Sequence, residues 1–168
     1  VPVAPPSPEA RITLFRALFR GREDVYAERW EGRDGRSGYT PASEKDWVAL
    51  LATKPEDRKR VHRQTRKLLP LTDQIIRLHL TGKKTVGIYP LLTDENCWLL
   101  AADFDKKTWQ DDAAAFLTTC RKIGIPAYLE RSRSGNGGHV WIFFERAIPA
   151  VLARKMGCAI LTQTMERR

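Results

Sequence analysis

Six consecutive apolar residues, 97–102, run directly into the triplet Asp103-Phe104-Asp105. A continuous apolar run of this length is typical of a central β-strand that is buried on both faces. Alternate residues of a strand point to the same face, so Asp103 and Asp105 are expected side by side while Phe104 faces away. The chain is therefore predicted to carry two carboxylates at the end of an inner strand.

The segments after this strand follow the order of an α+β fold. An apolar stripe with helical spacing covers 113–123, and a second amphipathic helix is predicted over 149–167. Residues 127–131 and 139–144 are predicted to form two further strands. The order strand, helix, strand, strand, helix is that of the split βαβ motif, which is also called ferredoxin-like or RRM-like, with its last strand missing from this chain.

The first half of the chain is predicted to be an N-terminal α/β extension of this core. Residues 1–8 are rich in proline and predicted to be a linker, residues 9–85 form the extension, and the core occupies 86–168. Within the extension we expect a strand over 24–31 and a helical, increasingly basic stretch over 43–69.

The net charge of +9 and the isoelectric point near 9.8 indicate a polyanionic partner. Basic surfaces bind nucleic acid because phosphate contacts release counterions whatever the base sequence. The densest basic stretch supplies four candidate contacts: Lys59, Arg63, Arg66 and Lys67. A solvated helix face without a nucleic-acid role is an equally open interpretation of that stretch.

The chain shows no sign of a membrane or secretory destination. No apolar run approaches the roughly 20 residues of a membrane span, and no segment has the layout of a secretory signal. The cysteines Cys97, Cys120 and Cys158 are odd in number and widely spaced, as in free thiols of a reducing compartment. We expect a cytoplasmic protein without a membrane partner.

The paired acids are predicted to meet a histidine from another strand. The first and third strands of a ferredoxin-like sheet are antiparallel neighbours, so the end of one lies beside the start of the other. This places Asp105 next to His139, with Asp103 on the same face. Two carboxylates at this spacing suit Mg²⁺ or Mn²⁺, which bind oxygen ligands and substrate phosphates. A strand that simply ends in two solvated acids remains the alternative.

A glycine-rich loop precedes His139 and is predicted to bind phosphate. Three glycines within 135–138 allow backbone N–H groups to converge on an anion, and polar side chains flank them. The candidate nucleotide-binding residues are Arg131, Arg133, Ser134, Asn136, Gly137, Gly138 and His139. A flexible hairpin loop would explain the glycines but not the flanking arginines and the histidine.

Two stretches of the sequence resemble motifs of the archaeo-eukaryotic primases. Residues 99–105 resemble the first motif, apolar residues followed by Asp-x-Asp, and residues 134–139 resemble the second, a small residue leading to a histidine. Three further stretches, 14–31, 86–92 and 130–144, are similar to the primase domain of TOTE conflict systems. The resemblance covers most of the chain.

The resemblance implies a template-dependent nucleotidyltransferase, a DNA or RNA primase-polymerase that uses nucleoside triphosphates and Mg²⁺ or Mn²⁺. It implies that Asp103 and Asp105 are the catalytic metal ligands and that His139 and Ser134 contact the triphosphate. The expected partners are a nucleic-acid template and primer, and helicase and nuclease domains that are fused to or associated with the chain.

The sequence departs from the family pattern in two places. Family members commonly carry a cysteine cluster in the region matching 42–69, where this chain has none, so we predict a basic helix and no zinc. The family's third motif, an aspartate on the last strand, would follow Arg168, and Glu130 and Asp94 are poor substitutes by parity and position. We therefore expect a fragment that is truncated before the third acidic motif and is weakly active or inactive alone.

Two other functions are compatible with these residues. A non-catalytic, RRM-like nucleic-acid-binding module would use Trp141 and Phe143 on the open sheet face to stack bases. A metal-dependent nuclease or phosphoesterase would use the same acids to hydrolyse its substrate. A rolling-circle nuclease is disfavoured because position 141 is Trp and no tyrosine follows Tyr128.

Overall fold

The structure is a computed structural model that describes residues 6–166. These residues form two compact units, one made of 6–17 and 22–89 and the other of 18–21 and 90–166. The linker predicted over 1–8 lies mostly outside the described residues, and its last residue, Pro8, already begins a helix.

A small antiparallel sheet organises the first unit. Its strands lie in the order β2 (Ser37–Pro41), β1 (Ala27–Glu31) and β5 (Val86–Gly87). The charges and glycines of 32–38 indicate a turn or loop, and β2 begins within the last two residues of that segment. Gly35, with φ of 77°, closes the β1–β2 hairpin in a backbone conformation that glycine adopts without steric cost.

The region 43–69 is not the continuous basic helix that its composition suggests. It holds four short elements: β3 (Ser43–Glu44), α2 (Trp47–Leu51), α3 (Arg58–Thr65) and β4 (Lys67–Leu68). Strands β3 and β4 pair with each other, and Asp46 caps α2 by accepting a 3.0 Å hydrogen bond from the Ala49 N–H. Pro55 lies between the two helices, where it cannot donate the hydrogen bond that a continuing helix needs.

Helices α1 (Pro8–Leu18) and α4 (Asp73–Leu80) supply most of the remaining regular structure of the first unit. Thr72 caps α4 by accepting a hydrogen bond from the Ile75 N–H. The core of this unit joins residues from both helices, the sheet and the connecting segments: Ile12, Tyr26, Ala42, Leu71, Ile76 and Val86.

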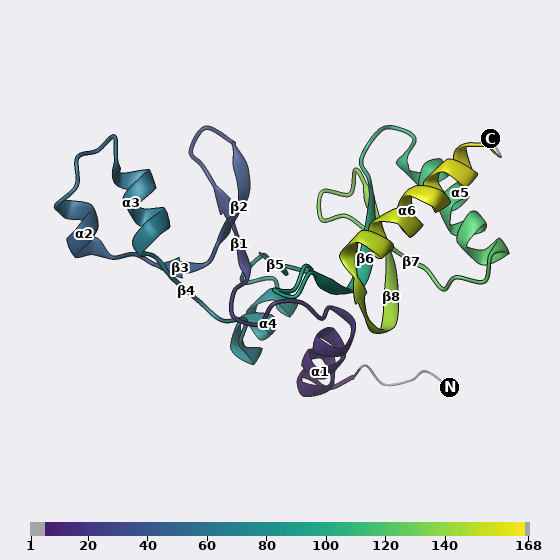
Figure 1. Cartoon of the computed structure of the whole chain (residues 1–168), viewed down its shortest axis with the longest axis horizontal. Coiled ribbons are helices and arrows are strands. Elements are labelled where there is room, and N and C mark those ends of the chain that lie inside the picture. The colour runs from purple at the N-terminus through teal and green to yellow at the C-terminus, as the bar shows by residue number, and fades with distance from the viewer. Residues whose placement is uncertain (1–5, 167–168) are drawn as a thin grey trace. The chain divides into compact units, whose positions relative to one another are not determined.

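The second unit has the element order that the sequence predicts. Its elements are β6 (Asn96–Phe104), α5 (Trp109–Lys122), β7 (Tyr128–Arg131), β8 (Gly138–Pro149) and α6 (Ala150–Met165). The strands form an antiparallel sheet in the order β6-β8-β7 (Figure 1). The protein is thus a mixed α+β fold with small antiparallel sheets.

The two faces of the β6-β8-β7 sheet differ as the period-2 pattern predicts. Leu100 lies opposite Ile142 and Ala102 opposite Val140, and these side chains pack against α5 and α6 in one core. Phe116 of α5 lies at the centre of this core and is 1% exposed. None of the helices within 6–166 is long and apolar enough to cross a membrane.

The expectation that 97–102 forms a central strand buried on both faces is only partly met. Cys97 and Leu99 are buried, but Ala101 is exposed. Within the described part of the chain, β8 is the central strand of the sheet and β6 lies at its edge.

Candidate functional site

Three polar side chains form one row across the β6-β8-β7 sheet. Asp103 of β6 lies directly opposite His139 of β8, and Glu130 of β7 lies opposite His139 on its other side. The His139 Nε2 atom is 3.6 Å from Asp103 Oδ1, and its Nδ1 atom is 3.5 Å from Glu130 Oε2. The imidazole therefore lies between two carboxylates on the face away from α5 and α6.

Glu130 is a member of this row that sequence reasoning set aside. Its carboxylate accepts a 2.7 Å hydrogen bond from the indole nitrogen of Trp141. The expectation that Glu130 is misplaced by parity is wrong, because Leu129 pairs with Val140 on the helix-covered side and Glu130 therefore points to the open side. Its position still differs from that of a third acid beside Asp103, since His139 separates the two carboxylates.

Asp105 lies one residue beyond the end of β6, and the register pairs Asp103, not Asp105, with His139. The glycine-rich loop closes directly on this strand end. A Cβ atom on Gly137 would lie 2.8 Å from the Phe104 carbonyl oxygen and 3.3 Å from Asp105 Cα. Glycine at 137 is thus what allows the loop to contact the backbone of the acidic triplet.

The loop is a tight turn held by its own hydrogen bonds. The Ser132 N–H donates to the Gly137 carbonyl, the Gly135 N–H donates to the Ser132 carbonyl, and the Asn136 N–H donates to the Ser134 hydroxyl. These three N–H groups are already engaged within the turn, so they are not available to an anion.

Some of the residues predicted to bind phosphate stabilise the loop instead, and others are exposed at its tip. The Arg131 guanidinium donates to the Gly135 carbonyl at 3.1 and 3.2 Å, so it stabilises the turn. Gly138 is buried, and a Cβ there would lie 2.7 Å from the Trp109 ring. Arg133, Ser134 and Asn136 are exposed at the tip of the loop.

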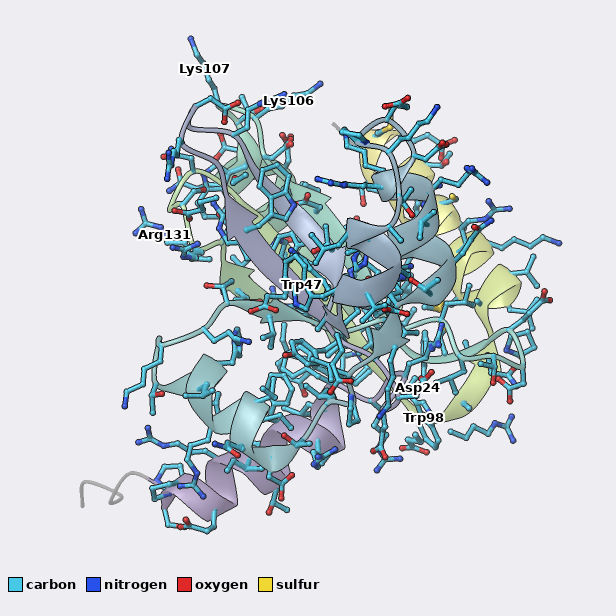
Figure 2. The ribbon with its side chains drawn as sticks, turned by 90° about the vertical axis from the view of Figure 1, so that its left-hand side faces the viewer. Asp24, Trp47, Trp98, Lys106, Lys107 and Arg131 are labelled. Carbon is cyan, nitrogen blue, oxygen red and sulfur yellow. The ribbon has the colours of Figure 1, made fainter. Side chains whose placement is uncertain are left out.

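Two lysines that sequence reasoning did not single out follow the acids directly. Lys106 and Lys107 are exposed, and Figure 2 shows their side chains extending into solvent at the same end of the ribbon as Arg131. Trp98, nearer the start of β6, lies at the opposite end. No motif marks these lysines, and their position after Asp105 was the only signal that could have found them.

The aromatic side chains of the open face are partly covered. Trp141 and Phe143 are nearly parallel, with ring centroids 6.5 Å apart. Phe19 packs edge-on against both rings, at 5.1 Å from Trp141 and 5.6 Å from Phe143. The stacking surface that these rings would offer to bases is therefore occupied in part by the protein itself.

The basic residues predicted to contact nucleic acid lie in the first unit on and after α3. Lys59 and Arg63 are exposed and four residues apart, so they share one face of the helix. Arg66 follows the last turn with an extended backbone, and Lys67 begins β4.

The acids at the end of β6 offer a donor set that fits a hard cation. Asp103 has a side chain that is 69% exposed, and Asp105 is exposed as well. Between residues 6 and 166, no three His, Cys, Asp or Glu side chains are grouped closely enough to hold a metal by themselves. Mg²⁺ typically binds one or two carboxylates together with water and substrate phosphates, so two acids meet its requirement.

The fold and the site define an α+β domain in which an acid–histidine row lies at the end of an antiparallel sheet. The chain matches the family described as the archaeo-eukaryotic primase domain of TOTE conflict systems over residues 10–168, and it belongs to that family. The resemblance expected from the two motifs is thereby confirmed, and the family is one of primase-type nucleotidyltransferases. No curated protein matches the chain.

Proposed function

We propose that this chain is the nucleotidyl-transfer domain of a template-dependent primase-polymerase. The observation that carries the proposal is the direct pairing of Asp103 with His139, at 3.6 Å, where the glycine loop closes on Asp105. The order β6-β8-β7 with both helices on one face supports an RRM-like core, and among the described residues that core covers 90–166. The core was expected to begin at residue 86, but β5 (Val86–Gly87) pairs with β1, so 86–89 belong with the extension that carries the basic helix α3.

Asp103 and Asp105 would hold Mg²⁺ or Mn²⁺ as the catalytic ligands. The bound metal would supply charge neutralisation for the triphosphate and would lower the pKa of the attacking hydroxyl. In the reaction, the 3′-oxygen of the growing strand bonds to the α-phosphorus, the bond from that phosphorus to the bridging oxygen breaks, and pyrophosphate leaves. The hydroxyl proton passes to solvent.

His139 would bind the triphosphate, and the row across the sheet supports that role. Asp103 and Glu130 lie on its two sides, at 3.6 and 3.5 Å from its two ring nitrogens. The exposed loop tip, with Arg133, Ser134 and Asn136, would add phosphate contacts, and Gly137 and Gly138 allow its close approach. Arg131 would act through the turn that it stabilises.

The remaining partners that we propose rest on the charge of the chain and on its family resemblance. Lys59, Arg63, Arg66 and Lys67 would contact the template backbone, in keeping with a net charge of +9. A domain of this kind would act in the cytoplasm together with helicase and nuclease domains.

A non-catalytic RRM-like binding module is less well supported than the nucleotidyltransferase. It needs Trp141 and Phe143 free for bases, and Phe19 packs against both. A metal-dependent nuclease or phosphoesterase would use the same two acids, Asp103 and Asp105, and would differ from a polymerase in its product.

Calorimetric titration of Mn²⁺ with and without a non-hydrolysable nucleoside triphosphate analogue tests the proposal. We expect each ligand to tighten binding of the other, since both contact the same site. Asp103→Ala and Asp105→Ala should remove this coupling, while Asp111→Ala, an exposed acid in the first turn of α5, should keep it. Absence of coupling in the wild-type chain would favour the binding module.

Incubation with a labelled primer–template separates the two enzymatic functions. Extension products support a polymerase, and shortened strands support a nuclease.

A further inference from the structure

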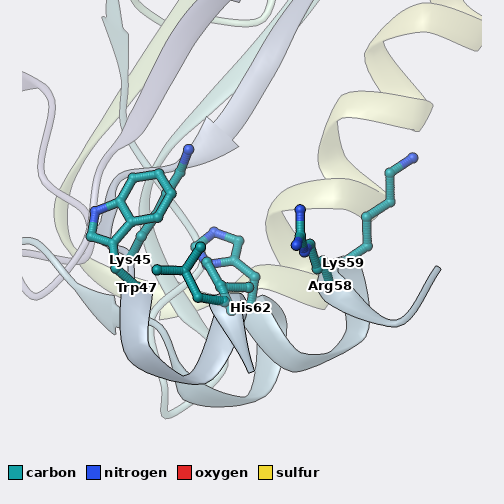
Figure 3. A pocket seen from close by; sticks show the side chains of 7 residues that line it. Lys45, Trp47, Arg58, Lys59 and His62 are labelled. Atoms are coloured by element: carbon teal, nitrogen blue, oxygen red, sulfur yellow. The ribbon is translucent and has the colours of Figure 1, made fainter. Parts of the chain in front are cut away.

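A pocket lies between α2 and α3, in the first unit, far in sequence from the acidic triplet. Its accessible space is about 230 Å³. Its apolar part consists of Trp47, Leu50 and Leu51, and its polar part comes from Lys45, Arg58, Lys59 and His62 (Figure 3). This volume is below the roughly 300–1,000 Å³ of pockets that enclose whole cofactors, so it suits a smaller flat group.

Large apolar side chains of this pocket are exposed to solvent. Trp47 is 61% exposed and Leu51 is 74% exposed, although Leu50 next to them is buried. Neighbouring apolar side chains in contact with water are typical of a surface that another molecule covers. The indole is the largest of these groups, and it offers a flat face for stacking.

Positive charge borders the apolar surface on both sides. The Lys45 ammonium lies over one face of the Trp47 ring, 5.1 Å from its centroid, which leaves the other face for stacking. Figure 3 shows Arg58 and Lys59 across the pocket from Trp47 and Lys45. Two of the nearby acids are engaged elsewhere, since Asp46 caps α2 and Asp57 pairs with Arg60 at 3.0 Å. The pocket therefore complements a ligand that is both flat and anionic.

His62 gives a second indication that the pocket is functional. Figure 3 shows its imidazole between Trp47 and the α3 cations. Its Nδ1 atom is shielded from solvent and has no hydrogen-bond partner among residues 6–166. Buried polar atoms are rarely left without a partner, so this atom calls for an explanation, and a bound ligand that supplies the missing contact is one.

We propose that this pocket binds one unpaired base of a single-stranded nucleic acid. The base stacks on Trp47, and the flanking phosphates contact Lys45, Arg58 and Lys59. Stacking on an aromatic side chain tolerates any base but requires that the base be unpaired. The proposal extends the proposed function and rests on it in one respect, because the copied strand of a primase-polymerase is such a nucleic acid. An acidic peptide could use the cations but has no need of the indole face.

Fluorescence anisotropy with a labelled deoxythymidine oligonucleotide and the full chain tests the pocket. Trp47→Ala should weaken binding about 5- to 150-fold, the range that stacking of one base supplies, and Trp47→Phe should restore most of it. Trp30→Ala is the matched control, since Trp30 is a partly exposed tryptophan of β1 in the same unit.

The salt dependence of binding tests the phosphate contacts. Lys59→Ala should lower the slope of log affinity against log salt concentration by about 1. Lys83→Ala serves as its control, since Lys83 is an exposed lysine outside the pocket.

The outcomes separate this proposal from the catalytic one. The proposal is overturned if folded Trp47→Ala, checked by its melting temperature, binds the oligonucleotide as the wild type does. It is also overturned if the loss is equal for duplex DNA, or if a polyglutamate peptide competes as well as the oligonucleotide. The catalytic proposal is judged without any oligonucleotide, by metal–nucleotide coupling in the wild-type chain. Either proposal can therefore fail while the other stands.

Discussion

The indole nitrogen of Trp141 donates a 2.7 Å hydrogen bond to Glu130, whose same carboxylate oxygen lies 3.5 Å from Nδ1 of His139. Trp141 and His139 both belong to β8, so one strand holds the acid and the imidazole that faces it. The carboxylate is thereby fixed beside the ring that we propose to contact the triphosphate. We therefore expect Glu130 to help position His139.

Glu130→Ala should weaken binding of a nucleoside triphosphate analogue about 3- to 10-fold, the effect of one lost hydrogen bond or weak ion pair. Glu130→Gln should recover part of the loss, because the amide oxygen can still accept from Trp141. Calorimetry with the analogue and Mn²⁺ measures both variants, and Glu145→Ala, an exposed acid of β8, provides the comparison. Wild-type affinity in Glu130→Ala would show that His139 needs no support from this carboxylate.

Gly137→Ala should disturb the site without touching any charged group. The added Cβ would lie 2.8 Å from the Phe104 carbonyl oxygen, which belongs to the backbone and cannot rotate away. We expect a loss of stability of about 1–3 kcal/mol, typical of overpacking, and weaker analogue binding as the loop moves off β6. Thermal unfolding and calorimetry measure the two effects. Gly87→Ala is the control, since its Cβ would meet Ala27 Cβ at an ordinary 3.5 Å, and equal behaviour of the two variants would contradict the argument.

The second unit could be predicted largely from local pattern. Period-2 alternation puts Leu100 and Ala102 on one face and Asp103 on the other, and the strand pairing bears this out. Exact register was beyond the sequence, because β6 and β8 are joined only through α5 and β7, and the β7–β8 register depends on the conformation of the loop 132–137. That is why Asp105 was expected opposite His139, where Asp103 lies, and why Glu130 was set aside.

The basic region of the first unit was predicted less well. Its many charged residues indicate a solvated segment but do not indicate where a helix ends. Pro55 was the available signal for a break, and the two-residue strands β3 and β4 are too short for any alternation to be visible. The role of Arg131 was missed for a similar reason, since its bond to the Gly135 carbonyl exists only once the turn has formed.

The three cysteines should differ sharply in reactivity with a disulfide reagent. Burial raises the pKa of the Cys97 and Cys120 thiols above the ordinary value, whereas Cys158 is exposed. The thiolate is the reacting form, so a raised pKa keeps Cys97 and Cys120 protonated to a higher pH. We expect Cys158 to react at once, and the other two only after denaturant is added. A Cys158→Ser variant with a remaining fast thiol at neutral pH would show that one of the two buried positions opens to solvent.

His139→Ala should separate triphosphate binding from metal binding. If the imidazole contacts the phosphates, its loss should weaken a triphosphate analogue about 10- to 100-fold, the range of a charge-assisted hydrogen bond. Mn²⁺ binding without nucleotide should fall far less, because Asp103 and Asp105 remain. Calorimetry of both ligands tests this, with His79→Ala as the control, since His79 lies on α4 in the other unit. A variant that loses Mn²⁺ and keeps the analogue would reverse the roles, making His139 a metal ligand and moving phosphate recognition to the loop tip and to Lys106 and Lys107.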